Sequence, residues 1–208
     1  EVKRTSGTAA IRVHADHGSS PRAAIEFIRG TTDTFGGDAY TDWKLGQIGT
    51  TQADFAIISH DTTRGANERL TIEYDTGNVG VGENAPLGKL HVKDGDAGSI
   101  TTNGAHDTII VEGSDNTGIN IFSPNTSYQY LAFGDTESSN SGYVRYQHSI
   151  NQMVLRAGAT DTVYINSGEV GIGVTNPSEK LEVAGNIKHT GLTMTSGTDV
   201  DQLYTVTK

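Results

Sequence analysis

Short segments along the chain alternate hydrophobic and polar residues with a period of two. In the segment 69–74, Leu70, Ile72 and Tyr74 alternate with Thr71 and Glu73. Runs of this kind, rich in β-branched and aromatic side chains, predict half-buried β-strands. The expected strands are 10–14, 23–28, 43–46, 54–59, 69–74, 108–111, 118–122, 131–134, 143–148 and 161–166.

Clusters of turn-forming residues separate these runs. Examples are DHGSSP at 16–21, DTFGGD at 33–38 and TESSNSG at 136–142, in which Gly, Pro, Asn, Asp and Ser favour turns. No stretch shows the i, i+3, i+4, i+7 spacing of apolar residues that is typical of an amphipathic helix. The pattern therefore predicts an all-β fold.

One segment of the chain occurs twice. GNVGVGENAPLGKLHV (77–92) and GEVGIGVTNPSEKLEV (168–183) are identical at eight of sixteen positions without a gap, at an offset of 91 residues. The expected strands before each copy also follow one another in the same order. Because a fixed offset is the signature of a repeat architecture, we expect two β-rich units, 1–92 and 93–187, each ending in this glycine motif, and a short tail or connector at 188–208.

The motif places glycine at every second position of an extended segment. Gly80 and Gly82 in the first copy, and Gly171 and Gly173 in the second, leave one face of the strand without side chains. A bare face lets another backbone approach closely, so we expect these glycines at the axis of a homotrimer. The alternative is that they only provide positive φ angles in turns. A proline follows in each copy, Pro86 in the first and Pro177 in the second. We expect both prolines to end the strand ladder and so to have the same structural role.

The composition favours association with other protein chains and argues against nucleic acid or a membrane as a partner. Hydrophobic residues make up 34% of the chain and 26 of the 208 residues are glycine, so a unit of this size buries little by itself, and repeats of this kind usually complete their cores against neighbours. The net charge of −10 argues against nucleic acid and against an anionic membrane surface. The chain has no cysteine and no apolar run long enough for a membrane span.

The two copies of the glycine motif and the region between them resemble a known protein family. Segments 68–92 and 162–188 look like the GNVGIGTTxPxxKLxVxG repeats of tailed-phage tail fibres and related viral adhesion proteins, and segment 118–158 is similar to the globular part that often precedes that motif. The resemblance implies an elongated homotrimeric virion appendage. It would lie outside the cell, join other tail-fibre segments and attach to a host, with a surface glycan as candidate receptor. The departures from the motif, Glu83-Asn84-Ala85 and Leu87-Gly88, affect only the local turn.

Cofactor and metal sites have little support in the sequence. Gly80-x-Gly82-x-x-Ala85 formally matches a dinucleotide fingerprint, but Pro86 prevents the helix that the fingerprint needs, so no cofactor is expected. His14, Asp16 and His17 could hold a divalent metal, and Asp94 and Asp96 a calcium ion. For both groups a solvated surface is the favoured interpretation.

Catalytic residues also have little support in the sequence. A polysaccharide depolymerase needs two carboxylates flanking a cleft, and no pair is fixed by spacing among Glu26, Asp38, Asp42, Asp135 and Glu137. We therefore expect a non-enzymatic protein, with a depolymerase and a secreted bacterial adhesin or carbohydrate-binding module as alternatives.

Aromatic rings suit sugar faces, and the candidate glycan-binding residues are Tyr40 and Tyr128. Trp43 and Phe133 occupy matching places in the two units and are expected in the core.

Overall fold

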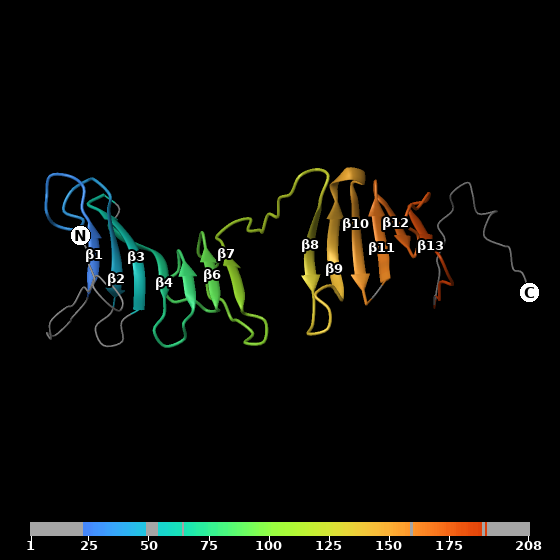
Figure 1. Ribbon diagram of the computed structural model, residues 1–208, viewed down its shortest axis with the longest axis horizontal. Coiled ribbons are helices and arrows are strands. Elements are labelled where there is room, and N and C mark those ends of the chain that lie inside the picture. The colour runs from blue at the N-terminus through green and yellow to red at the C-terminus, as the bar shows by residue number, and fades with distance from the viewer. Residues whose placement is uncertain (1–22, 49–53, 64, 159, 189, 191–208) are drawn as a thin grey trace, which may run out of the picture. The chain divides into compact units, whose positions relative to one another are not determined.

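A computed structural model describes residues 23–48, 54–63, 65–158, 160–188 and 190 of the chain. These residues form thirteen strands and one 3-10 turn, which confirms the predicted all-β class. The chain divides into two units, Glu1–Ile119 and Asn120–Lys208, each containing one sheet (Figure 1). No helix among the described residues is long and apolar enough to cross a membrane. The expected strand 10–14 lies outside the described residues.

The first unit is a seven-stranded sheet in which the spatial order of the strands is their order along the chain. The first four pairs of neighbouring strands are antiparallel, and the last two pairs are parallel. The strands are β1 Ala24–Phe27, β2 Asp42–Ile48, β3 Asp54–Asp61, β4 Gly65–Ile72, β5 Val79–Val81, β6 Leu90–Lys93 and β7 Ile109–Glu112.

The second unit is a six-stranded sheet that also follows chain order. All neighbouring strands are antiparallel except the last pair, which is parallel. The strands are β8 Tyr128–Phe133, β9 Gly142–Gln147, β10 Gln152–Ala157, β11 Thr160–Asn166, β12 Glu169–Ile172 and β13 Leu181–Val183, with the 3-10 turn η1 His148–Ile150 between β9 and β10.

The repeated motif forms the same loop in both units. It links the parallel pairs β5–β6 and β12–β13, and its proline is buried in each copy. One backbone hydrogen bond recurs: Val79 N donates to Lys89 O at 2.9 Å, and Val170 N donates to Lys180 O at 3.1 Å. The connection is shorter than the dozen or so residues that parallel strands usually need, because the proline loop turns the chain back beside the strand it has just left.

Two expectations about strands are wrong. Segment 118–122 is not a strand, since no neighbouring strand pairs with it: β8 pairs only with β9, and β7 pairs parallel with β6. Strand β10 was not predicted, because Met153, Val154 and Leu155 are consecutive apolar residues that obscure the alternation.

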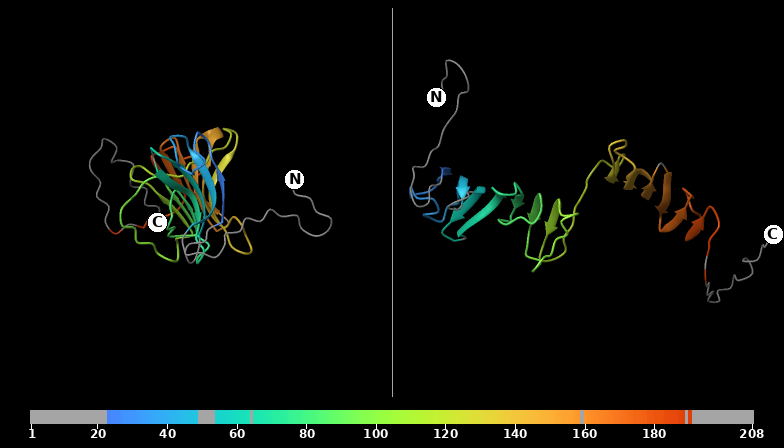
Figure 2. Two further views of the ribbon diagram at one scale, coloured as in Figure 1. Left: turned by 90° about the vertical axis from the view of Figure 1, so that its left-hand side faces the viewer. Right: turned by 90° about the horizontal axis from the view of Figure 1, so that it is seen from below.

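Each unit consists of a single sheet, one layer of strands thick (Figure 2). Among the described residues the buried hydrophobic side chains are only Ala56, Ile58, Tyr143 and Val154. Buried polar groups instead fix loops against one face. Asp42 is 1% exposed, and its two carboxylate oxygens accept hydrogen bonds from the backbone N–H groups of Arg29 at 2.7 Å and Gly36 at 2.8 Å.

The Asp42 contacts generate a first prediction. Asp42→Asn turns one of the two acceptor oxygens into an N–H donor, which leaves a backbone N–H unpaired. We expect a loss of about 1–3 kcal/mol in unfolding free energy, measured by urea denaturation. Asp33→Asn, an exposed position in the same loop, is the matched control and should change stability little. Equal stability of both variants would contradict the anchoring role of Asp42.

Candidate interaction surfaces

The second sheet has one face made almost entirely of apolar side chains. Residues paired across neighbouring strands share a face, so the register defines it directly. One row crosses all six strands through Leu131, Val144, Leu155, Val163, Ile172 and Val183. With their neighbours in the adjacent rows, the residues of this apolar face are Leu131, Phe133, Val144, Met153, Leu155, Ala157, Val163, Ile165, Val170, Ile172, Leu181 and Val183.

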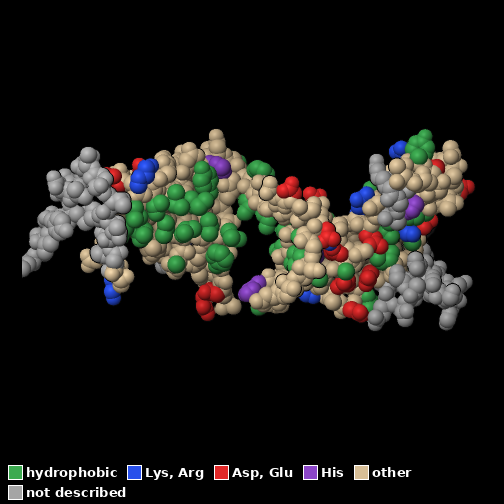
Figure 3. All heavy atoms as spheres, turned by 180° about the vertical axis from the view of Figure 1, so that it is seen from behind, with side chains coloured by type: hydrophobic (Ala, Val, Ile, Leu, Met, Phe, Trp, Pro, Cys, Tyr) green, Lys and Arg blue, Asp and Glu red, His purple; other side chains and the backbone are tan. Residues whose placement is uncertain are grey.

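No other described element of the second unit covers this face. Leu131, Phe133 and Leu181 are each 58% exposed, and no ladder position on the face carries a charge. Figure 3 shows it as a broad hydrophobic area over the second unit. Monomeric soluble proteins rarely expose contiguous apolar patches beyond a few hundred Å², so the face has the character of an interface.

The first sheet has an equivalent apolar face. Phe27 is 57% and Ile109 62% exposed on it, although they lie in strands at opposite ends of the sheet. A continuous row crosses all seven strands through Ile25, Leu45, Ile57, Leu70, Val81, Val92 and Val111.

Trp43 and Phe133, predicted as core residues, are not buried in the single chain. Trp43 is 44% and Phe133 58% exposed. Both lie on the apolar faces, Trp43 opposite Phe27 and Phe133 opposite Gly142. The prediction was wrong because the alternation identifies the apolar face of a strand but not what covers it.

Gly80 and Gly171 have no room for a side chain, because the loop that follows each of them passes close to it. Gly80 and Gly171 lie on the polar faces, opposite the apolar rows. A Cβ atom added to Gly80 would collide with the carbonyl oxygen of Glu83, and one added to Gly171 with that of Val174. The close backbone approach that the sequence indicated is therefore made within the chain. The role of these glycines at a trimer axis stays a prediction.

Gly82 and Gly173 have a backbone conformation that favours glycine. Gly82 has a φ of 74° and Gly173 a φ of 71°, the left-handed region that side chains with a Cβ rarely adopt. The turn interpretation thus applies to these two positions. A Cβ atom on Gly82 would also collide with the carbonyl oxygen of Lys93, so close approach acts at Gly82 as well as at Gly80 and Gly171. Pro86 and Pro177 are buried in the loops that follow, and Asn78 Nδ2 donates to the carbonyl oxygen of Pro86 at 3.2 Å.

Tyr128, a predicted glycan-binding residue, belongs to a tyrosine–arginine cluster on the polar face of the second sheet. Tyr128 and Tyr130 are 45% and 41% exposed, and the guanidinium carbon of Arg145 lies 5.2 Å from the centroid of the Tyr128 ring. Sequence analysis missed the other members, although their i, i+2 spacing in β8 and β9 was a usable signal. The cluster comprises Tyr128, Tyr130, Tyr143, Arg145, Arg156 and Asp161.

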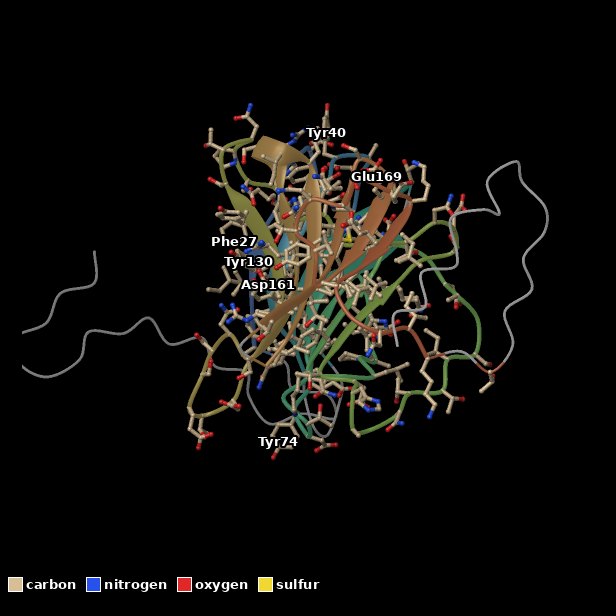
Figure 4. The ribbon with its side chains drawn as sticks, turned by 90° about the vertical axis from the view of Figure 1, so that its right-hand side faces the viewer. Phe27, Tyr40, Tyr74, Tyr130, Asp161 and Glu169 are labelled. Carbon is tan, nitrogen blue, oxygen red and sulfur yellow. The ribbon has the colours of Figure 1, made fainter. Side chains whose placement is uncertain are left out.

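Asp161 connects the cluster from β11, which two strands, β9 and β10, separate from Tyr130 on β8 (Figure 4). Its carboxylate lies 3.6 Å from Arg145 Nη2 and 3.9 Å from Arg156 Nη1, and it accepts a hydrogen bond from the Tyr143 hydroxyl. Burial, and then this bond, raise the pKa of the Tyr143 hydroxyl above its ordinary value. Two guanidinium groups share one carboxylate, which gives the cluster an excess positive charge.

Tyr40 lies in the other unit, in the loop before β2. Its side chain is 49% exposed, with the guanidinium carbon of Arg29 5.0 Å from the ring centroid. Its backbone N–H donates to Asp38 Oδ1 at 2.9 Å. The two predicted glycan-binding tyrosines therefore belong to separate sheets, each beside an arginine.

The carboxylates considered for catalysis act as structural groups. Hydrogen bonds from the backbone of Thr31 and Tyr40 lower the pKa of Asp38, and those from Ser138 and Glu137 lower the pKa of Asp135. A catalytic acid in a glycosidase needs the opposite shift. Glu26 lies 3.7 Å from Lys44 Nζ, and Asp42 anchors its loop.

Of the metal candidates in the sequence, Asp94 and Asp96 are exposed. Asp96 Oδ1 accepts a hydrogen bond from Gly98 N at 2.8 Å, as in an ordinary Asx turn, while His14, Asp16 and His17 lie outside the described residues. Within the part of the chain that the structure describes, the only three ligand-type side chains close enough to share an ion are Glu83, His91 and Glu112. Neither calcium candidate belongs to that group.

Comparison with known proteins found no match: no family model matches the chain, and neither does any curated protein.

The Tyr143 hydroxyl provides a second prediction. Tyr143→Phe removes the bond to Asp161, and because Tyr143 is 3% exposed, we expect a loss of about 0.5–1.5 kcal/mol in unfolding free energy at pH 7. The folded state favours the neutral hydroxyl, so this contribution is complete below the ordinary pKa of 10.0 and disappears as the pH rises above it. Thermal denaturation from pH 7 to 11 measures both effects, with the more exposed Tyr130→Phe as control. A loss at pH 7 that is equal in the two variants would contradict this assignment.

Proposed function

We propose that this chain is a structural and adhesive segment of a homotrimeric viral tail fibre, an extracellular virion appendage used in host attachment. The observation that carries the proposal is the pair of uncovered apolar faces, one on each sheet. Both are continuous across every strand, and the face of the second sheet is free of charge at its ladder positions.

Copies of the same chain are the natural cover for these faces. Full burial of a Leu, Ile, Val or Phe side chain contributes about 1.5–3 kcal/mol, and on each sheet many such side chains are a third to two-thirds exposed. Covering them gains several kcal/mol for each chain. The resemblance of residues 68–92 and 162–188 to the repeats of trimeric phage fibres favours three copies over two.

With the apolar faces inside such a trimer, the polar faces are directed toward solvent. Gly80 and Gly171 then lie on the outer faces, so this arrangement differs from the axial position that the sequence predicts for them. The tyrosine–arginine cluster then presents the half-exposed rings of Tyr128 and Tyr130 beside Arg145. Aromatic rings bind the apolar faces of sugars, and guanidinium groups pair with carboxylates. This combination supports a host surface glycan, in particular one containing acidic sugars, as the receptor.

A pair of adjacent substitutions tests the assembly. Ile165 lies on the apolar face and Asn166 on the polar face of the same strand. We expect the protein to sediment at three times the 22.0 kDa chain mass, Ile165→Asp to dissociate it at micromolar concentration, and Asn166→Asp to leave it trimeric. A wild-type protein that sediments as a stable monomer would overturn the proposal.

Glycan binding is tested separately, on arrays that include acidic and neutral oligosaccharides. Tyr128→Ala and Tyr130→Ala should each reduce binding at least about tenfold, since full burial of a large apolar side chain contributes about 1.5–3 kcal/mol. Tyr74→Ala, at a 64% exposed position of the first unit, should have no effect. Binding that survives both cluster substitutions would exclude this surface, while leaving the fibre assignment to the sedimentation result. Release of new reducing ends from host polysaccharide would instead favour a depolymerase.

A further inference from the structure

A buried group of charged and polar side chains lies where β5, β6 and β7 meet in the first unit. Glu83 follows β5, His91 is the second residue of β6, and Glu112 ends β7. The imidazole and the two carboxylates each have one ligand atom within 4.8 Å of the others. His91 is 0% and Glu112 4% exposed, so this group, the Glu83–His91–Glu112 site, is largely shielded from solvent.

The imidazole of His91 is oriented toward the carboxylates. Its Nδ1 faces the backbone N–H of Leu87, which donates to it at 3.4 Å, so Nε2 points to the other side. Nε2 lies 2.9 Å from Glu112 Oε2, yet it forms no aligned hydrogen bond. Two atoms that each lie about 2.0–2.1 Å from one metal ion are roughly 3 Å apart and are not in line with each other's lone pairs. The observed separation fits neighbouring ligands of a shared ion.

The second repeat shows that the fold does not need this group. At the positions equivalent to Glu83, His91 and Lys93, 91 residues further on, the chain has Val174, Glu182 and Ala184. The same loop and the same parallel strand pair form there, with Glu182 accepting a hydrogen bond from its own loop at Ser178 N. Burying charged groups costs several kcal/mol each. Their presence in only one of two equivalent loops therefore points to a function of the group itself.

Lys93 supplies the positive charge at this site. Its Nζ lies 2.9 Å from Glu83 Oε2 and 3.3 Å from Glu112 Oε1. The bond to Glu83, and then that to Glu112, raise the pKa of Lys93. Burial acts to raise the pKa of Glu83, but the bonds from Lys93 and from Ala85 N outweigh it and leave that pKa below its ordinary value.

A polar cavity of about 320 Å³ adjoins the site and reaches Glu83 and Lys93. It gives an ion a way in from solvent, and it offers the Lys93 ammonium group a polar place to move to. The flexible four-carbon stem of lysine makes such a movement inexpensive. The cavity is lined by Asn67, Glu68, Gly82, Glu83, Asn84 and Lys93.

We propose that Glu83, His91 and Glu112 bind a divalent transition-metal ion of the zinc type, which displaces the Lys93 ammonium group from the two carboxylates. One imidazole nitrogen with two carboxylate oxygens suits zinc and cobalt, whereas calcium takes six to eight oxygen ligands. The ion would link the glycine loop to β6 and β7, and would thus fix the end of the first sheet. This inference does not depend on the proposed fibre function.

The test is a titration of the full-length, metal-free chain with Zn²⁺ by calorimetry, and with Co²⁺ by visible absorption. We expect one ion per chain, an absorption band of low-coordinate Co²⁺, and a higher melting temperature with Zn²⁺. Glu83→Gln, at a half-buried loop position, should weaken binding at least about tenfold. Lys93→Gln should strengthen it, because the competing cation is removed.

A double variant, His14→Ala with His17→Ala, is the matched control for adventitious binding by the N-terminal histidines, and it should leave the affinity unchanged. The absence of saturable Zn²⁺ binding would overturn the proposal. So would Zn²⁺ binding that Glu83→Gln leaves intact and the His14/His17 double variant abolishes. Circular dichroism of each variant shows whether it is folded, and because Lys93→Gln predicts a gain of affinity, a general loss of structure cannot imitate its expected result.

Discussion

The structure depends on hydrophobic burial that the described residues of each sheet leave incomplete. Each sheet is a single layer, and its apolar rows run across every strand without a second layer among the described residues of its own unit. A sheet of this kind is stable only when its hydrophobic face packs against something else. The small internal core, the absence of charge on the ladder positions of the second sheet's face and the exposed rings of Phe27, Trp43 and Phe133 all follow from this one requirement.

The opposite faces are ordered by polar contacts instead. Buried Asp42 binds the loop before β2 through two backbone N–H groups, and Gln152 Nε2 donates to Thr175 O at 2.9 Å, which fixes the second glycine loop. Loops that pack on these faces leave Gly80 and Gly171 no room for a side chain. One face of each sheet is thus specified by directional hydrogen bonds, and the other by nondirectional apolar contact.

The sequence was sufficient to predict the all-β class and to show that the glycine motif is repeated, because alternation and repetition are local properties. It did not predict that the motif forms a loop between two parallel strands of one sheet, as it does in both copies. It failed where pairing between strands decides the outcome. Segment 118–122 has a strand pattern but no partner, whereas β10 has a partner that its consecutive apolar residues did not indicate. The Glu83–His91–Glu112 site escaped notice because the parallel pairing of β6 with β7 brings Glu112 beside His91 across 21 residues of sequence. The tyrosine–arginine cluster likewise depends on the register of four strands.

In both sheets every strand pairs only with the strands before and after it in the chain. The contacts within a sheet are therefore local in sequence, and closing each connecting loop costs little entropy. Such a sheet can grow strand by strand as the polypeptide leaves the ribosome, without waiting for a distant segment. The same arrangement exposes apolar rows from the first hairpin onward, so newly made chains are prone to aggregate until their faces are covered. If the chain assembles as proposed, the encounter between chains, which depends on concentration, would govern the yield of native protein more than the formation of the sheets does.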